Sequence, residues 1–338
     1  MGLTNESVGM HAVDSGLMIK KQTPEDRVIA IAGNPNVGKS TLFNNLTGMN
    51  QHTGNWPGKT VSNAQGYCAT KKRSYVLVDI PGTYSLMAHS AEEEVARNFI
   101  CFGHPDAVAV VCDATCLERN LNLVLQTLEI TDRVIVCVNL MDEAERKHIK
   151  IDLKGLSDRL GVPVVGITAR KKKTLTLFLK ELDEITEAGR SLQPYRVTYA
   201  EEIERAVSMI EPVLRKKLAN GPDPRWVSLR LLDSDKSLLR ELNETLGEDL
   251  LLDGEVSAAI ERAKALLGTA PPEDLIVSGL VAAAEEICKE TVRYDKSTYH
   301  AADRRIDRVL TGKRFGYPDM ILLLAFILWL TITGANYP

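Results

Sequence analysis

The sequence predicts an α/β fold, a mostly parallel sheet with helices on both faces, followed by a helical domain and an apolar C-terminal helix. Short apolar runs typical of buried strands alternate with helical stretches in the first half of the chain. After about Thr174 no strand-like run remains, and helix-forming residues dominate to about Leu267. At the far end, residues 320–338 include no charged residue. These observations divide the chain into three parts of different character.

The apolar runs of the first half have the length and composition of central strands. We expect strands at 28–32, 75–79, 107–113, 133–139 and 162–168. Helices are expected between them at 40–46, 91–102 and 117–130. Because strands and helices alternate, the sheet should be mostly parallel and covered on both sides. Further along, leucines at helical spacing in 238–252 indicate a helical domain, and another helix is expected at 275–292.

Composition is that of a globular protein of about two domains. The chain has 338 residues, of which 44% are hydrophobic and 25% are charged, so it can form an ample core. A net charge of -4 argues against a nucleic-acid surface. The six cysteines have no metal-type spacing and mostly lie in apolar runs, which favours buried cytosolic thiols. We place a tail at 1–24, the α/β domain at 25–173, the helical domain at 174–270, a linker with a juxtamembrane helix at 271–318, and a membrane helix at 319–338.

A glycine-rich segment between the first strand and the first helix matches the phosphate-loop pattern G-x-x-x-x-G-K-[ST]. Its residues are Gly33, Asn34, Pro35, Asn36, Val37, Gly38, Lys39 and Ser40, followed by Thr41. Glycines let the backbone curl so that its N–H groups surround a β-phosphate. Lys39 would supply charge to the β- and γ-phosphates, and the Ser40 hydroxyl would reach Mg²⁺. The segment therefore predicts a nucleoside triphosphate site.

A second motif at the end of a later strand selects guanine. In Asn139-Leu140-Met141-Asp142, the Asp142 carboxylate can accept hydrogen bonds from N1–H and the exocyclic amine of guanine, a donor pair that adenine lacks. Asn139 would contact the other edge of the base and pin the loop. Leu140 stands where a lysine is usual, and Met141 belongs to the same base-binding segment. Thr168-Ala169-Arg170 closes the last strand, where the Ala169 N–H is expected to meet guanine O6.

The residues expected to contact the γ-phosphate and Mg²⁺ lie between these two motifs in the sequence. Asp79 ends a strand and would act on Mg²⁺ through water, while the Gly82 N–H would meet the γ-phosphate. Thr60 is the candidate switch threonine that would bind Mg²⁺ only with GTP present. Thr83 occupies the position where many GTPases have a water-orienting glutamine, and its side chain is too short for that role. We therefore expect slow hydrolysis that depends on another stabiliser.

Together these stations predict a P-loop GTPase of the Ras-like type that binds GTP, GDP and Mg²⁺, with Lys39, Thr60 and Gly82 acting in catalysis. The alternative is a soluble GTPase of ribosome assembly or tRNA modification. Such proteins usually carry a basic RNA-binding module, and residues 174–315 are not both basic and aromatic-rich. A GTP binder that does not hydrolyse also stays open, because Thr83 leaves hydrolysis unproven.

More specific motifs make the chain resemble the cytosolic part of the ferrous-iron transporter B (FeoB) family. They are Asn55-Trp56-Pro57-Gly58-Lys59-Thr60-Val61, Asp79-Ile80-Pro81-Gly82-Thr83-Tyr84-Ser85-Leu86, Asp113-Ala114-Thr115 and Leu117-Glu118-Arg119-Asn120-Leu121. Arg225-Trp226 resembles the family's helical domain, and Phe315-Gly316-Tyr317-Pro318 resembles the entry to its first membrane helix. As a departure, Lys171-Lys172-Lys173 replaces the glycine-bearing loop that is usual there.

The resemblance implies a GTPase that regulates a membrane permease for Fe(II), with a helical domain that modulates GDP release. It also implies potassium-stimulated hydrolysis, with K⁺ held by Asn36 and by the backbone carbonyls of Gly54 and Trp56. Asn36 is therefore added to the expected catalytic residues. The expected partners are GTP, Fe(II), membrane lipid, small accessory Feo proteins and a second copy of the chain, without nucleic acid. The expected location is the bacterial inner membrane, with the GTPase domain in the cytoplasm.

The apolar C-terminal run favours a membrane helix on two further grounds. Residues 320–330 are unbroken apolar residues, a length that also suits a buried core helix, whereas a span needs about 20 residues. A basic flank lies just upstream and favours a cytosolic N-terminal side. It consists of Arg304, Arg305, Arg308, Lys313 and Arg314. With the resemblance added, we expect the first transmembrane helix here.

Overall fold

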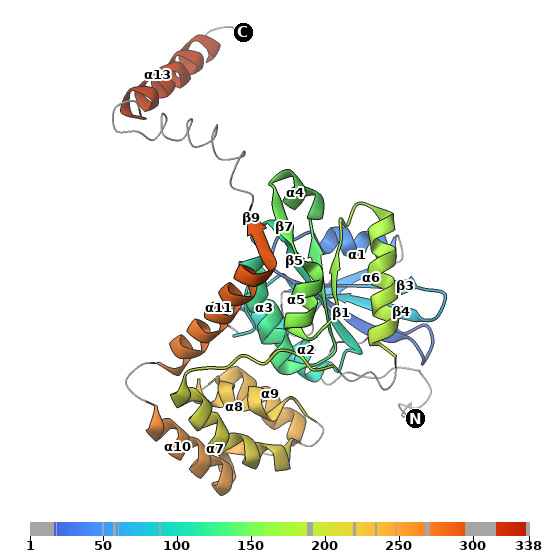
Figure 1. Cartoon of the computed structure of the whole chain (residues 1–338), viewed down its shortest axis with the longest axis vertical. Coiled ribbons are helices and arrows are strands. Elements are labelled where there is room, and N and C mark those ends of the chain that lie inside the picture. The colour runs from blue at the N-terminus through green and yellow to red at the C-terminus, as the bar shows by residue number, and fades with distance from the viewer. Residues whose placement is uncertain are drawn as a thin grey trace.

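The computed structural model describes residues 17, 19–48, 51–56, 59, 61–87, 89–187, 192–218, 221–233, 235–247, 249–267, 271–294 and 316–335. Figure 1 shows an α/β unit with an all-helical unit beside it, and helix α13 apart from both. The predicted mostly parallel α/β fold and the helical domain are confirmed.

A seven-stranded sheet forms the centre of the α/β unit, in the order β2-β3-β4-β1-β5-β6-β8. Its strands are β1 (Arg27–Gly33), β2 (Gln51–Asn55), β3 (Ser62–Ala69), β4 (Ser74–Asp79), β5 (Ala107–Asp113), β6 (Val134–Asn139) and β8 (Val164–Gly166). β4, β1, β5, β6 and β8 pair in parallel, whereas β2 and β3 pair antiparallel to each other and β3 to β4. The carboxyl ends of the parallel strands therefore meet at one edge, where α/β folds place their ligands.

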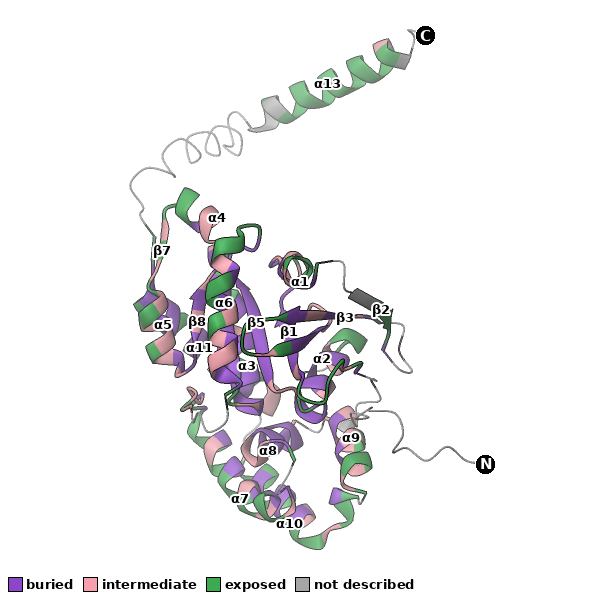
Figure 2. Cartoon of the chain, turned by 90° about the vertical axis from the view of Figure 1, so that its right-hand side faces the viewer, coloured by how far each residue is buried: buried purple, intermediate pink, exposed green. Residues whose placement is uncertain are grey.

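Alternate residues of the central strands face two separate helical layers. In β1, Ile29 and Ile31 join a core with α1 (Lys39–Thr47) and α6 (Lys172–Ile185). The intervening Ala30 and Ala32 join the opposite core with α2 (Ala91–Phe102), α3 (Leu117–Ile130) and α5 (Leu153–Leu160). Figure 2 shows these strands buried between the layers. Burial on both faces explains why the strands are continuous apolar runs.

The helical unit consists of α7 (Glu201–Lys217), α8 (Pro224–Leu232), α9 (Lys236–Leu246) and α10 (Gly254–Leu266). Asp223, Asp235 and Asp253 begin the last three helices, each accepting hydrogen bonds from N–H groups of the first turn. Its apolar core, including Trp226, is continuous with the α2 and α3 side of the α/β unit. Helix α11 (Pro272–Thr291) returns to pack against α3 and α5.

Buried polar pairs also join the two units. Arg97 on α2 is fully buried and pairs with Asp235 at the start of α9, with 2.6 Å between Nη1 and Oδ2. The Tyr199 hydroxyl donates to Glu129 on α3 at 2.6 Å. Burial raises the pKa of Glu129, although this hydrogen bond and nearby arginines oppose the rise. Charged groups are buried here in partnered form, because an unpaired buried charge is costly.

The structure differs from the expectations in a hairpin and in the extent of the α/β unit. The β2–β3 hairpin was not predicted. Helix α6 packs Leu175, Phe178 and Leu182 against the sheet, so the α/β unit runs past residue 173 to the end of α6. The Tyr75 hydroxyl of β4 also donates to Asp183 near the end of α6 at 2.6 Å. The helix expected at 275–292 is present as α11, which packs on the α/β unit.

The C-terminal apolar run forms α13 (Gly316–Ala335), a helix of 20 residues. Its large apolar side chains are exposed; Leu322, for example, is 70% exposed. Among the residues that the structure describes, no helix is both long and apolar enough to cross a membrane.

Candidate nucleotide-binding site

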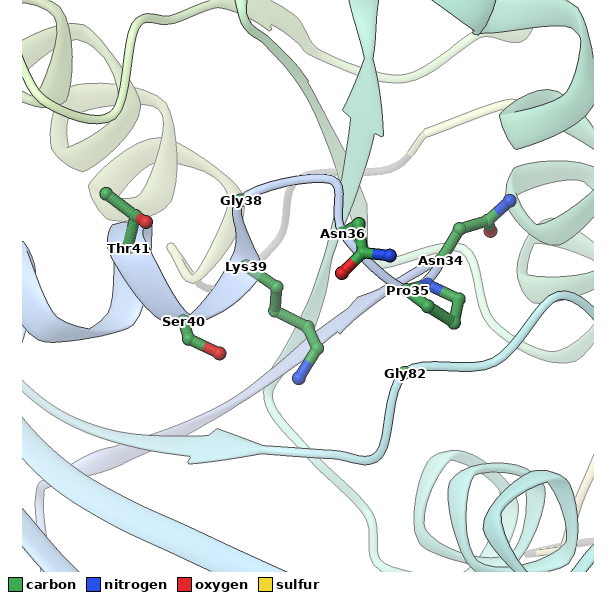
Figure 3. Close-up of a pocket in the computed structure, with 8 residues that line it drawn as sticks. All are labelled: Asn34, Pro35, Asn36, Gly38, Lys39, Ser40, Thr41 and Gly82. Carbon is green, nitrogen blue, oxygen red and sulfur yellow. The ribbon is translucent and has the colours of Figure 1, made fainter. Parts of the chain in front are cut away.

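The phosphate-loop residues line one pocket where β1 passes into α1. The pocket has a volume of about 480 Å³ and is lined by Asn34, Pro35, Asn36, Gly38, Lys39, Ser40, Thr41 and Gly82. Figure 3 shows Lys39 and Ser40 reaching from the first turn of α1, with Gly82 across from them on a separate segment. The helix N-terminus adds backbone N–H groups and a partial positive charge. The structure thus gathers the predicted phosphate and γ-phosphate stations around one cavity.

Two glycines are required by close contacts as well as by their backbone angles. Gly33 has φ 155°, and a Cβ there would lie 2.6 Å from the Val111 carbonyl oxygen of β5. Gly38 has φ 85°, and a Cβ there would lie 2.4 Å from Nδ2 of Asn139. Asn36 has φ 67°, a left-handed conformation that asparagine tolerates better than most residues. The loop is therefore curled tightly against β5 and the base-binding strand.

Lys39 forms a half-buried ion pair with Asp79, and its Nζ donates to the Ile80 carbonyl oxygen at 2.7 Å. Burial raises the pKa of the Asp79 carboxyl, and the Lys39 charge opposes this rise. A second pocket of about 460 Å³ meets the first at Lys39 and Gly82, and Asp79 lines it. The predicted phosphate-binding cation and magnesium-binding carboxylate thus lie side by side. Thr60 lies outside the described residues.

Asn139 fastens the phosphate loop to the loop after β8. Its side chain is 1% exposed, its Nδ2 donates to Val37 O at 2.9 Å, and its Oδ1 accepts from Ala169 N at 2.9 Å. An amide has two N–H groups, so one is left for the edge of a base. In this structure the Ala169 N–H is engaged by Asn139, and Arg170 supplies the next backbone N–H along the loop. The contact of the Ala169 N–H with guanine O6 stays a prediction.

Asp142 lies in the first turn of α4 (Met141–Arg146). The helix begins directly after Leu140, which has a left-handed backbone with φ 62°. It lines a pocket of about 510 Å³ together with Met141, Thr168 and Lys171. Thr168 is held by Thr174, whose hydroxyl donates to its carbonyl oxygen at 2.9 Å. The two base-recognition segments, far apart in the sequence, therefore border one cavity.

The hydroxyl of Thr83 forms hydrogen bonds within its own turn. Thr83 is 2% exposed, its hydroxyl donates to Ser85 O at 2.6 Å, and it accepts from Ser85 N at 3.2 Å. Sequence reasoning missed a residue that holds this segment, Gln126 of α3, whose Oε1 accepts from Leu86 N at 2.7 Å. A single glutamine in an apolar helix gave no signal for this contact. Thr83 thus has no free hydroxyl with which to orient a water molecule.

The residues expected to hold K⁺ come from two elements. Asn36 is exposed in the phosphate-loop pocket, whereas Gly54 belongs to β2 and Trp56 follows it. The Trp56 ring is buried edge-on against Phe99 of α2, with 5.3 Å between ring centroids. The Trp56 carbonyl oxygen accepts from Lys59 N at 3.0 Å.

Comparisons with known proteins identify relatives for both units. The family model for ferrous iron transport protein B matches residues 27–182, and that for the FeoB cytosolic helical domain matches residues 199–293. The Fe(2+) transporter FeoB of Salmonella typhimurium is 32% identical over 92% of this chain and 39% of its own length. A Fe(2+) transport protein A/FeoB fusion protein of Porphyromonas gingivalis is 31% identical over 92% of this chain and 37% of its own length. The GDP form of the cytosolic domain of the T. maritima FeoB iron transporter is 32% identical, with a TM-score of 0.65 over 79% of this chain and 99% of that one.

Proposed function

The chain belongs to the ferrous iron transport protein B family, and on that premise we propose that it binds and hydrolyses GTP to gate or regulate Fe(II) uptake by a membrane transporter. The chain spans about 39% of the length of the Salmonella relative. Transport of Fe(II) would therefore also need a region that corresponds to the remaining length of the Salmonella transporter. The observation that carries the nucleotide part is the Asn139 bridge, because one buried side chain holds the phosphate loop and the base-side loop together.

Calorimetry on the purified chain tests the nucleotide part. GDP and a non-hydrolysable GTP analogue should bind, while ADP should bind far more weakly. Release of phosphate from GTP would then establish hydrolysis. Equal affinity for ADP and GDP would overturn guanine recognition.

Guanine selectivity rests on the half-buried Asp142 carboxylate in this proposal. Asp142→Asn should weaken GTP and GDP binding by about 1.5–3 kcal/mol, the worth of hydrogen bonds to a charged group. It should also shift preference toward xanthine nucleotides, because an amide can donate to the xanthine oxygen. Asp158→Asn, an exposed position on α5, is the matched control and should bind like wild type. The assignment fails if Asp142→Asn retains wild-type affinity for GDP.

The residues present fit a magnesium ion. Ser40 offers an exposed hydroxyl in the phosphate-loop pocket, and Asp79 is a carboxylate in the adjoining one. Such hard oxygen donors, together with phosphate oxygens, are what Mg²⁺ prefers. When bound, the ion would neutralise charge on the β- and γ-phosphates. Ser40→Ala should chiefly weaken Mg²⁺-dependent binding.

The occupied Thr83 hydroxyl supports the proposed potassium dependence of hydrolysis. A fixed cation near the phosphates would stabilise charge that develops in the transition state, and the exposed Asn36 amide is suitably placed to hold it. We expect turnover in potassium chloride to exceed that in sodium chloride by about 10²-fold, the lower end of the effect of one transition-state contact. Asn36→Ala should abolish the difference while retaining GDP binding.

Matched ionic strength separates potassium stimulation from a general salt effect. Equal rates of the unmutated chain in the two salts would refute the potassium mechanism. Stimulation that survives in Asn36→Ala would instead refute Asn36 as the ligand.

Membrane attachment through α13 completes the proposal. A helix of 20 residues is about 30 Å long, close to the thickness of the hydrocarbon core. The exposed apolar side chains of α13 support contact with lipid at a bacterial inner membrane, with the α/β unit in the cytoplasm. The Porphyromonas gingivalis fusion protein supports a small accessory Feo protein as a partner.

A further inference from the structure

A small second sheet lies beside the base-recognition loop. Strand β7 (Ile149–Ile151) follows α4, and β9 (Val292–Tyr294) follows α11 directly. The two strands pair antiparallel, with Ile149 opposite Tyr294, Lys150 opposite Arg293 and Ile151 opposite Val292. Figure 1 shows β9 at the end of α11, next to β7 and on the α4 side of the α/β unit. The strand that precedes residues 295–315 and α13 is thus joined to the segment that carries Asp142.

On the β7 side, the connection to the guanine site is short. The pocket that Asp142 and Thr168 line is also lined by all three residues of β7. Between α4 and β7, Lys147 N donates to Glu143 O at 2.9 Å and His148 N donates to Glu145 O at 3.0 Å. This hydrogen-bonded turn leaves little slack, so a displacement of β7 is passed to the first turn of α4.

On the β9 side, the pairing continues into α11. Asp152 N donates to Thr291 O at 2.8 Å, and the Asp152 side chain caps α5 by accepting from Gly155 N at 2.9 Å. Arg159 of α5 also pairs with Glu286 and Glu290 of α11. Helix α11 itself is held by its packing against α3 and α5. Because exposed ion pairs contribute little, the backbone ladder is the main link between β9 and β7. Movement of α11 or of the chain after Tyr294 therefore acts on β7 through this ladder.

We propose that the β7–β9 pair couples the position of the chain after Tyr294 to the rate of guanine-nucleotide release. While the strands are paired, β7 holds the Asp142 turn against the base, and GDP leaves slowly. When β9 separates, the turn loosens and GDP leaves faster. A pair of three-residue strands is only marginally stable, so a modest force on β9 is enough to open it. The inference rests on the proposed function, since it concerns the same nucleotide site.

Arg293 is the position at which to break the ladder. Because Asp152 N donates to Thr291 O, the alternation of an antiparallel ladder makes Lys150 and Arg293 the next hydrogen-bonded pair. Arg293→Pro removes the N–H of that pair, and proline does not fit such a position. Arg293→Ala is the matched control, because the Arg293 side chain is exposed and alanine keeps the N–H.

The release of a fluorescent GDP analogue from the full chain is measured by stopped flow. Arg293→Pro should release it about 5-fold faster or more, the lower end of typical coupling between sites, and Arg293→Ala should match wild type. A second measurement needs no variant. Coupling is reciprocal, so GDP binding should slow hydrogen exchange of the amides at 292–294 in the unmutated chain.

The outcomes separate the two ideas. A chain that does not bind GDP contradicts the proposed function. If GDP binds, unchanged exchange at 292–294 overturns the coupling even where Arg293→Pro fails to fold. Release from a folded Arg293→Pro at the wild-type rate overturns it as well.

Discussion

Lys39→Ala should lose most of its nucleotide affinity and reduce GTP turnover by about 10²–10³-fold or more, the cost of removing one preorganised transition-state contact. The Lys39 ammonium is the cation of the phosphate-loop pocket and lies against Asp79 at the end of β4. Alanine removes the charge that faces the β- and γ-phosphates and also leaves the half-buried Asp79 carboxylate without its cation. Calorimetry with GDP and phosphate release from GTP measure the two effects.

Lys180→Ala is the control for loss of a lysine charge. Lys180 is on α6, with its side chain 70% exposed and only a loose pair to Glu184 at 3.8 Å. Removing it should change neither binding nor turnover. Wild-type turnover in Lys39→Ala would mean that hydrolysis takes place at another site.

The central strands and their helices could be predicted from the sequence because burial on both faces demands unbroken apolar runs. The expected strand at 107–113 and the expected helices at 91–102 and 117–130 coincide with β5, α2 and α3. Strand β2 could not be found in this way, because Gln51–Asn55 is polar and contains a glycine. The segment forms a strand because its backbone pairs with β3, and its own side chains give no sign of this pairing.

Motif residues of the site were predictable, while the contacts that position them were not. Local spacing identifies Gly33, Lys39 and Asp142, because each belongs to a short pattern with a chemical purpose. Asn139 instead bonds to the backbone of Val37 and Ala169, which the fold alone brings close. For the same reason, nothing in the sequence indicates that the Ala169 N–H bonds to Asn139.

The boundary between the two units was misplaced because helical propensity is the same on both sides of it. Residues 172–185 read as the beginning of a helical domain, and only packing against β6 and β8 assigns α6 to the sheet. Contacts between the units involve residues far apart in the chain, such as Arg97 with Asp235. Nothing in a local window indicates that two such residues meet.

Arg97→Ala should lower the free energy of unfolding by about 3–5 kcal/mol, the usual cost of removing one partner from a buried ion pair. Arg97 is fully buried, its Nη1 lies 2.6 Å from Asp235, and its Nη2 donates to Ser237 Oγ at 3.0 Å. Burial alone would raise the pKa of Asp235, but the Arg97 charge and the N–H groups of α9 hold it below its ordinary value. Without Arg97, the Asp235 carboxylate stays half-buried with no cation beside it.

Urea unfolding followed by tryptophan fluorescence measures this loss, because Trp56 packs on α2 and Trp226 lies in the helical unit. Arg205→Ala is the control, since Arg205 forms an exposed pair with Glu201 within α7 and should change stability by less than about 0.5 kcal/mol. A loss below about 1 kcal/mol for Arg97→Ala would show that the interface readjusts around the cavity. A large loss would establish that α2, which follows Asp79 and Gly82 in the chain, is held in place by the helical unit.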